Sequence, residues 1–432
     1  MARLPRDLSI LFTTRIVRLF AYGSLSVILA LYLAAVGLTD AQIGLLLTLT
    51  LVGDTIVSLW LTTRADRFGR RRTLLIGALL MVAAGLVFAI SDTFLVLLAA
   101  ATIGVISPSG NEVGPFLPIE QAALSQVVSD VKRTRTFAWY TLVGAVATAC
   151  GSLTGGLLVD GLQWARVGKI ESYRAGIAGY ALMGLGLLAL FACLSPATEI
   201  SRSAAPAKSA RRHFLGLDHS RNVVLRLAGL FSLDAFGGGF VIQSIAAYWF
   251  YKRFDIPASA LGGIFFGANL LAGISALCAT RLAARFGLVN TMVFTHLPSN
   301  VLLILVPLMP NLPLSIAVLM LRFSISQMDV PTRQSYVMAV VPPEERSAAA
   351  GVTGVARTTG AALAPLLAGI LLSHPSTFDL PFYLAGGVKI VYDFLLYRSF
   401  VSVRPPEEMV SASSPQVREP SEVTAPDRTI AR

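Results

Sequence analysis

Charged residues are scarce in this chain of 432 residues. Only 14% of the positions are Asp, Glu, Lys or Arg, whereas 55% are hydrophobic. Soluble domains carry roughly 25% charged residues, so this composition excludes a soluble protein and indicates one embedded in a lipid bilayer. Because a membrane helix takes about 20 mostly apolar residues, the apolar share of the chain suffices for about twelve spans.

Cysteine and histidine are also rare, with three and four residues respectively. The cysteines lie in apolar runs without a CxxC pair, which excludes a disulfide framework and a zinc site. The histidines are scattered, so we expect no metal and no other cofactor. The chain also lacks a GxxxxGK[ST] phosphate loop, a nucleophile elbow and a loop long enough for a soluble active site. These absences disfavour ATP as the energy source and disfavour a membrane enzyme.

The apolar runs predict an all-α polytopic membrane protein with twelve transmembrane helices. The predicted spans are residues 10–36, 41–62, 73–91, 93–128, 137–159, 176–194, 223–250, 259–280, 290–309, 314–341, 348–372 and 380–400. One long connection, rich in Ser, Ala and Arg, follows the sixth span. The expected units are an N-terminal six-helix bundle at 1–194, a cytoplasmic loop at 195–222, a C-terminal six-helix bundle at 223–400 and a disordered cytoplasmic tail at 401–432.

The net charge of +11 would suit a nucleic-acid partner in a soluble protein. Here Lys and Arg concentrate in the loops on the same side of the predicted spans as the N-terminus, which is typical of cytoplasmic loops. We therefore expect a multi-pass protein of the plasma membrane with both termini in the cytoplasm. We expect a monomer with no nucleic-acid partner.

The sequence repeats itself. The segment TTRADRFG at 62–69 returns as TRLAARFG at 280–287, an offset of 218 positions, and PIEQ at 118–121 returns as PTRQ at 331–334, an offset of 213. Spans two to five thus correspond to spans eight to eleven. Because this displacement is an even number of spans, the two halves share their orientation, which predicts a parallel repeat of six plus six helices.

The loop between spans two and three carries the string DRFGRRR at 66–72. This string resembles the D-R-x-G-R-[RK] signature of the major facilitator superfamily, and the chain resembles that family up to about residue 400. The resemblance implies two pseudo-symmetric six-helix bundles around a central cavity that opens alternately to either side. It also implies a gate, in which this loop holds the cytoplasmic ends of the bundles together in one state; the alternative is a plain positive-inside anchor. The gating residues would be Asp66, Arg67, Gly69, Arg70 and Arg71.

A second segment, GSLTGG at 151–156, is similar to the GPxxGG antiporter motif of drug exporters in this family. Ser152 stands in place of the motif's proline, and a proline occurs instead at Pro365 in the second half. Small residues also let helices approach closely, so helix packing is the alternative interpretation.

Ionisable residues inside the spans are expensive to insert and are candidates for function. The candidates for proton coupling are Asp54, Glu112, Asp234 and Asp329. Asp234 can instead form a fixed salt bridge with Arg357 or Arg333, and Asp329 can be neutralised by Arg333, four residues on. The candidates for the substrate cavity are Arg18, Tyr22, Asn111, Arg322, Arg333, Gln334 and Arg357.

Two of these groups have a local pattern. Arg322, Ser326, Asp329 and Arg333 follow a helical spacing, which predicts one polar face on the tenth span. Asn111 and Glu112 lie among prolines and glycines in the fourth span, which predicts a broken membrane helix. A re-entrant loop is the alternative.

The sequence favours a secondary transporter for a small organic solute, coupled to protons and working as an exporter. The alternative within this class is uptake or exchange of a small organic anion, which the interior arginines would suit. A transporter-like receptor without turnover and a polytopic membrane enzyme are the other classes considered. The expected partners are the solute, protons and the lipid bilayer.

Overall fold

The computed structural model describes residues 6–128, 130–199, 217 and 219–401, and within these ranges it is helical without strands. The helices are α1 (Arg6–Ala35), α2 (Asp40–Phe68), α3 (Arg70–Ile90), α4 (Phe94–Ile103), α5 (Phe116–Val127), α6 (Asp130–Trp164), α7 (Lys169–Ala192), α8 (Arg221–Gly239), α9 (Gln243–Phe254), α10 (Ala258–Phe286), α11 (Leu288–Leu305), α12 (Leu312–Phe323), α13 (Asp329–Ala339), α14 (Arg346–Leu372) and α15 (Leu380–Phe400). The expected tail lies almost entirely outside the described residues.

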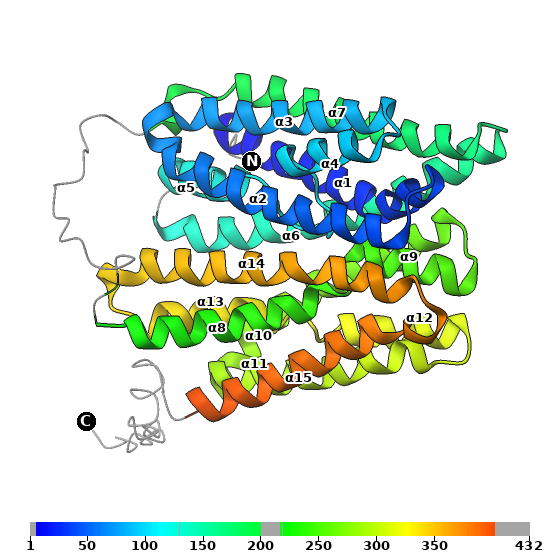
Figure 1. Ribbon diagram of the computed structural model, residues 1–432. Helices are drawn as coiled ribbons and strands as arrows, with labels where there is room; N and C mark the ends of the chain where they lie inside the picture. The colour runs from blue at the N-terminus through cyan, green and yellow to red at the C-terminus, as the bar shows by residue number, and fades with distance from the viewer. Residues whose placement is uncertain (1–5, 129, 200–216, 218, 402–432) are drawn as a thin grey trace, which may run out of the picture.

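The all-α membrane architecture predicted from the sequence is confirmed. Ten stretches within the described residues are long and apolar enough to cross a membrane, and two shorter apolar helices, α4 and α12, belong to interrupted crossings. Figure 1 shows the helices of the first half, α1 to α7, on one side of the molecule and those of the second half, α8 to α15, on the other. We call the end where α1 begins and α15 ends the terminal end, and the opposite end the far end.

Three crossings are broken rather than continuous. The fourth is interrupted between α4 and α5, where Gly110 and Gly114 adopt positive φ angles of 70° and 78° and two prolines remove N–H donors. The seventh breaks between α8 and α9, directly after the glycine run 237–239. The predicted break of the fourth span is therefore confirmed.

The tenth crossing is also broken, and here the sequence prediction is wrong. Residues 324–328 separate α12 from α13, so Arg322 ends one helix whereas Asp329 and Arg333 belong to the next. Pro331 explains the break, because it has no N–H to bond the carbonyl four residues earlier. The polar residues of this span do not share one continuous helical face.

The two halves meet through close backbone contacts. A Cβ added to Gly44 of α2 would lie 2.5 Å from the carbonyl oxygen of Pro365 in α14, and one added to Gly262 of α10 would lie 2.7 Å from that of Ser152 in α6. The offsets of 218 and 213 relate Gly44 to Gly262 and Ser152 to Pro365. The two contacts are therefore repeats of each other, and we call them together the glycine seam.

Candidate functional site

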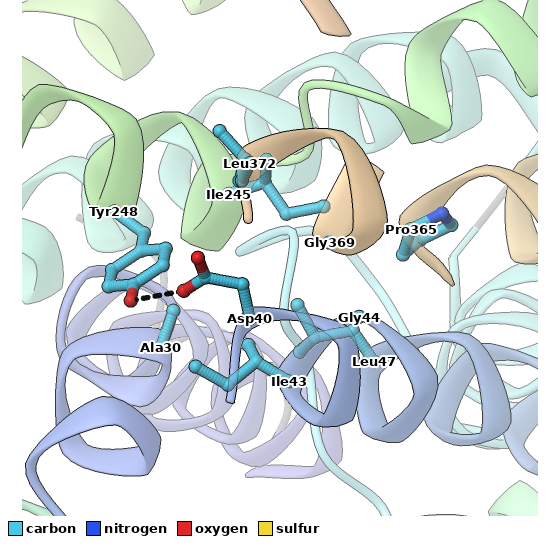
Figure 2. Close-up of a pocket in the computed structure, with 10 residues that line it drawn as sticks. All are labelled: Ala30, Asp40, Ile43, Gly44, Leu47, Ile245, Tyr248, Pro365, Gly369 and Leu372. Carbon is cyan, nitrogen blue, oxygen red and sulfur yellow. Dashed lines mark hydrogen bonds between the residues drawn. The ribbon is translucent and has the colours of Figure 1, made fainter. Parts of the chain in front are cut away.

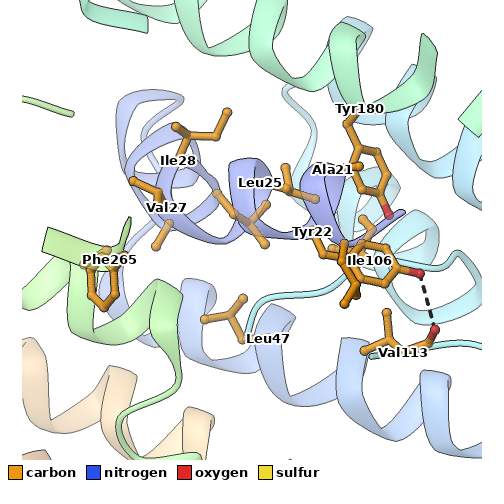
Figure 3. Close-up of a cluster of buried hydrophobic side chains, with 14 of the residues drawn as sticks. Ala21, Tyr22, Leu25, Val27, Ile28, Leu47, Ile106, Val113, Tyr180 and Phe265 are labelled. Carbon is orange, nitrogen blue, oxygen red and sulfur yellow. Dashed lines mark hydrogen bonds between the residues drawn. The ribbon is translucent and has the colours of Figure 1, made fainter. Parts of the chain in front are cut away.

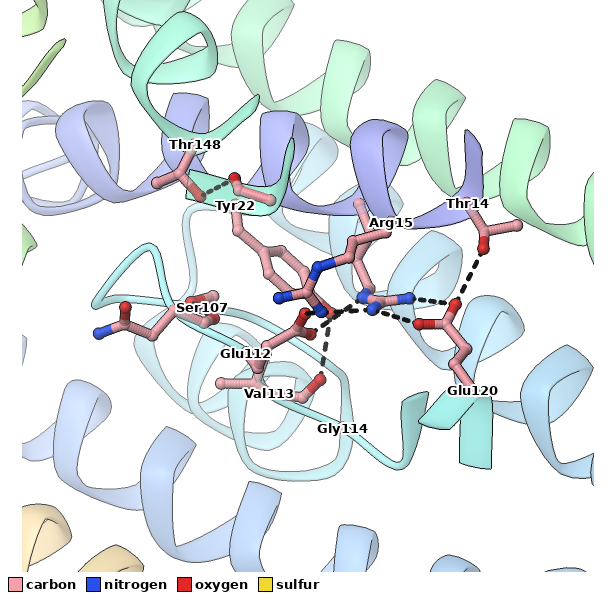
Figure 4. A network of polar contacts seen from close by, with 12 residues as sticks. Thr14, Arg15, Tyr22, Ser107, Glu112, Val113, Gly114, Glu120 and Thr148 are labelled. Carbon is pink, nitrogen blue, oxygen red and sulfur yellow. Dashed lines mark hydrogen bonds and ion pairs between the residues drawn. The ribbon is translucent and has the colours of Figure 1, made fainter. Parts of the chain in front are cut away.

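A buried ionic network fills the core of the first half (Figure 4). The Arg18 guanidinium of α1 is fully buried and donates two hydrogen bonds of 2.7 Å to the Glu120 carboxylate of α5. Its Nε lies 3.1 Å from Glu112 Oε2. Tyr140 and Thr14 also donate to Glu120, the latter at 2.9 Å. Arg18 thus has acidic partners within the protein.

Glu112 also binds a second arginine. Arg15 Nη1 lies 2.5 Å from Glu112 Oε1, and the Arg15 side chain is 7% exposed. Arg15 can remain buried because the broken fourth crossing brings the Glu112 carboxylate into the core beside α1. Two arginines and two glutamates compensate one another, as buried charges must.

Tyr22 belongs to the packed core of the first half. Its ring is fully buried, its hydroxyl donates to the Val113 carbonyl oxygen at 3.3 Å, and it stacks on Tyr180 with centroids 6.3 Å apart (Figure 3). Asn111, by contrast, is exposed within the irregular stretch between α4 and α5. Of these two cavity candidates, only Asn111 has its side chain in open space.

Asp54 of α2 faces the same irregular stretch. Its Oδ1 accepts a hydrogen bond of 2.6 Å from the Gly114 backbone N–H and one of 3.1 Å from the Ser58 hydroxyl. Both donors are neutral. Asp54 therefore differs from Glu112, whose carboxylate is held by two guanidinium groups.

A second buried network fills the core of the other half. Asp234 of α8 lies 2.9 Å from Arg333 Nη1 of α13 and 2.6 Å from Lys389 Nζ of α15. Arg333 also lies 3.2 Å from Asp329. Of the three pairings considered from the sequence, Asp234 with Arg333 and Asp329 with Arg333 are present, whereas the described residues show no ion pair between Asp234 and Arg357.

Sequence reasoning missed part of this second network. Asp393 accepts hydrogen bonds from Asn300 at 3.0 Å and lies 2.8 Å from His296 Nδ1, while His296 Nε2 lies 3.6 Å from Asp234. Neither His296 nor Lys389 was singled out from the sequence. The signal was present, because Lys389 and Asp393 stand four residues apart in an otherwise apolar span.

The two networks are related by the internal repeat, with their charges exchanged. Glu120 corresponds to Arg333 at the offset of 213, and Arg18 precedes Asp234 by 216 positions, between the two offsets of the repeat. In each half the first helix is joined to the second part of a broken crossing by one buried ion pair. An arginine on α1 meets a glutamate on α5, whereas an aspartate on α8 meets an arginine on α13. We call these the inverted pairs.

Arg322 and Arg357 are the remaining cavity cations. Both side chains are partly exposed, and their buried Nε atoms have no hydrogen-bond partner among the described residues. Arg322 lies over the Phe323 ring, 4.8 Å from its centroid. Gln334 is exposed on α13.

The described part of the predicted gating loop forms hydrogen bonds with residues of the first half. Gly69, with φ of 98°, ends α2, and the backbone N–H groups of Arg70 and Arg71 donate to the Glu199 carboxylate at 2.8 and 3.0 Å. The Arg71 guanidinium also donates to the carbonyl oxygen of Ala192. The side chains of Asp66 and Arg67 lie outside the described residues.

The far end holds hydrogen bonds between the halves that the sequence did not reveal. The Asp40 carboxylate at the start of α2 accepts a bond of 2.6 Å from Tyr248 of α9 (Figure 2). It also accepts one of 2.7 Å from Lys252 of the same helix. Lys169 donates to Tyr251, and Asp160 accepts from the backbone of Ser259. We call Asp40, Tyr248 and Lys252 the far-end latch.

Polar contacts between the halves continue from the latch toward the middle. Gln243 donates to Ser26 at 2.8 Å and to Ser152 at 3.1 Å, and Asn269 donates to Gln243 at 3.1 Å. The hydrogen bonds that the described residues make between the halves therefore lie in the middle of the molecule and at its far end.

Comparison with known proteins gives a consistent family. A family model described as Major Facilitator Superfamily matches residues 11–362 and 233–426. An uncharacterized membrane protein of Saccharomyces cerevisiae is 32% identical over 427 residues, which are 92% of this chain and 95% of that protein. The quinolone resistance protein NorA of Staphylococcus aureus is 23% identical over 374 residues, which are 84% of this chain and 88% of NorA.

Solved structures share the fold. A mutant of the nucleoside transporter NupG aligns with a TM-score of 0.75 at 14% identity, covering 91% of this chain and 99% of that one. A D-xylose-proton symporter aligns with a TM-score of 0.71 at 14% identity, covering 90% and 97%.

Proposed function

The chain belongs to the Major Facilitator Superfamily and is a multi-pass transporter of small solutes, and from this premise we propose that it exports its solute in exchange for protons by alternating access. The family is one of transporters, so the chain is not an enzyme. Direction, coupling and the residues responsible are our proposals.

The glycine seam is the observation that supports alternating access. Two symmetry-related contacts join α2 to α14 and α6 to α10, and the described hydrogen bonds between the halves lie at the middle and the far end. Rigid halves that meet in this way can rock against each other, so that the seam parts when the far end opens and the terminal end closes. The GSLTGG segment lies in this seam, which agrees with its interpretation as a packing motif.

The orientation follows from the loop charges. With both termini in the cytoplasm of the plasma membrane, the far end faces outward and the described state is closed to the outside. The proposed units remain the bundles 1–194 and 223–400 with the connection 195–222. In the opposite state, we propose that Asp66, Arg67 and the neighbouring residues of their loop bind the second half and close the cytoplasmic end.

Asp54 is our proposed proton site. Its described partners are neutral donors, so a proton can bind its carboxylate without breaking an ion pair. Glu112, Asp234 and Asp329 are each held by a cation, and protonating any of them would leave a buried positive charge uncompensated. Asp54 also contacts the irregular stretch between α4 and α5, through which its charge can affect the shape of the cavity.

Solute flux in proteoliposomes with an imposed pH gradient tests this proposal. We expect a gradient to accelerate movement of norfloxacin, chosen as a quinolone, toward the compartment from which protons flow, and ethidium serves as the cationic comparison. Asp54→Asn should remove the acceleration, whereas the control Asp255→Asn, an exposed loop position, should keep it. If the pH gradient does not change the solute flux of the wild type, proton coupling is rejected. Solute binding without flux would indicate a receptor.

Uptake or exchange of an organic anion is the second candidate. The observation that favours it is the pair of interior arginines, Arg322 and Arg357, for which the described part of the chain offers no acidic partner within 4.0 Å. The same vesicles decide between the directions when the two protein orientations are separated by a protease-accessible tag on one terminus. Accumulation of the solute in the compartment into which the protons flow would indicate symport and would reject export by exchange for protons.

A further inference from the structure

Two interior arginines of the second half have no ion-pair or hydrogen-bond partner among the residues that the structure describes. Arg322 ends α12 at the break of the tenth crossing, and Arg357 lies in α14, two helical turns before the seam residue Pro365. Among the described residues neither guanidinium has a carboxylate within 4.0 Å or donates a hydrogen bond to any group, and the Nε of each is shielded from solvent. Charged groups inside a membrane protein normally pair, so these two require an explanation.

Nearby acids do not supply the missing partners. Asp234 and Asp329 are within electrostatic range of both arginines, but Asp234 is bound by Arg333 and Lys389, and Asp329 is bound by Arg333. Arg333 adds a like charge close to Arg357. The carboxylates of this network are therefore committed, and the region retains an excess of positive charge.

Other cations of the interior are not available to a ligand. Arg18 and Arg15 are neutralised by Glu112 and Glu120 in the first half, and Arg333 by its two aspartates in the second. This leaves Arg322 and Arg357 as the cavity candidates with free donors. Each guanidinium offers several N–H groups in a planar fork that suits a carboxylate or a phosphate.

Open space adjoins these donors. On α14, Gly354, one turn before Arg357, and Thr358, the next residue, are exposed, and a Cβ added to Gly354 or to Gly351 would meet nothing within 4 Å. Both arginines are themselves partly exposed. A ligand can therefore reach their free donors without displacing protein side chains.

We propose that the transported solute carries an anionic group, a carboxylate or a phosphate ester, which Arg322 and Arg357 bind. This inference rests on the proposed function and names its substrate class. The bound anion supplies the charge that the second network lacks, and its departure leaves two uncompensated cations. The protein without a bound anion is therefore less stable than the anion-bound protein, and this difference favours rebinding of an anion.

Thermal unfolding of the purified full-length protein in a neutral detergent tests the site independently of transport. The probes are benzoate, phenyl phosphate and the uncharged benzamide. We expect the two anions to raise the unfolding temperature of the wild type and benzamide to leave it unchanged. Arg322→Gln and Arg357→Gln should each weaken the effect of benzoate about ten-fold or more, whereas the control Arg398→Gln, exposed at the end of α15, should not.

The variants also separate a ligand site from a structural role. Removing an unpaired buried charge should raise the unfolding temperature of the ligand-free protein, while removing a structural ion pair would lower it. Arg322→Lys should restore part of the benzoate effect. A wild type that responds equally to benzoate and benzamide, or variants that are destabilised and still respond to benzoate, would overturn the proposal.

Two further experiments distinguish a lipid headgroup from a free solute as the bound anion. They also distinguish a failure of the anion inference from a failure of the transport proposal. If nanodiscs of phosphatidylglycerol stabilise the wild type relative to phosphatidylcholine while benzoate has no effect in either, the sites bind lipid headgroups and the solute proposal is rejected. In proteoliposomes, export of ethidium without carboxyfluorescein would reject the anion inference alone. Anion-specific stabilisation without flux of any probe would reject the transport proposal and keep the anion site.

Discussion

Adding one methyl group to the glycine seam should open the far end. In Gly262→Ala the new Cβ would lie 2.7 Å from the Ser152 carbonyl oxygen and 3.2 Å from the Leu153 Cα. These atoms belong to the backbone of α6, so the strain cannot be relieved by a rotamer change. The neighbouring Gly263 has nothing within 4 Å of an added Cβ, which makes Gly263→Ala a matched control in the same helix.

The magnitude follows from the cost of overpacking. Inserting a methyl group into a tight contact costs about 1–3 kcal/mol, and this cost falls on the state in which the seam is closed. The ratio of far-end-open to far-end-closed molecules should therefore rise by about 5- to 150-fold. The gain in helix propensity from Gly to Ala, about 0.5–1 kcal/mol, is common to both variants and cancels in the comparison.

The assay is thiol labelling at the far end. Leu47 lies buried beside the latch (Figure 2), so a cysteine in its place should react with a water-soluble maleimide only when the far end opens. The three natural cysteines, Cys150, Cys193 and Cys278, are first replaced by serine. We expect faster labelling in Gly262→Ala than in Gly263→Ala. Equal rates in the two variants would show that the seam does not control the opening.

Three other substitutions probe the remaining contacts. Asp40→Asn weakens the bond to Lys252, a partly exposed pair worth about 0.2–1 kcal/mol, and should raise the same labelling rate by a few-fold at most; a fall would contradict the latch. Arg18→Met leaves Glu120 uncompensated and should destabilise the folded protein by about 3–5 kcal/mol in thermal unfolding, part of which Arg18→Met with Glu120→Gln should recover; no recovery would mean that packing, not charge, is lost. Asp66→Asn should slow flux while leaving probe binding intact, and unaltered flux would reject the gate.

Much of the fold was readable from the sequence because a bilayer imposes length and polarity on each crossing. The repeat of TTRADRFG and PIEQ predicted two equivalent halves, and the prolines and glycines of the fourth crossing predicted its break. The break of the tenth crossing was not predicted, because helical spacing does not register that Pro331 lacks the N–H that the preceding turn requires. The helical spacing of Arg322 and Arg333 predicted that they share one face, but they belong to different helices.

The site was less predictable, because partners in a helical bundle come from distant parts of the chain. The sequence identified Arg18, Glu112, Asp234 and Arg333 as unusual charges, but not which of them pair. Asp40 and Tyr248 are ordinary residues of helix ends, and only the packing of the two halves brings them together. Charge can be read from a sequence, whereas the compensation of charge depends on tertiary structure.

The glycine seam also bears on the entropy of the transport cycle. At Gly44 and Gly262 of the seam, and at Gly156 and Gly369 on the same pairs of helices, the approaching atoms are all backbone atoms, and the glycines have no side chains to order. Parting these surfaces frees no rotamers, and bringing them together freezes none. Contacts of this kind, including Cα–H···O interactions, are individually weak. The two states can thus remain close in free energy at different temperatures, and a single bound solute or proton is enough to change their populations.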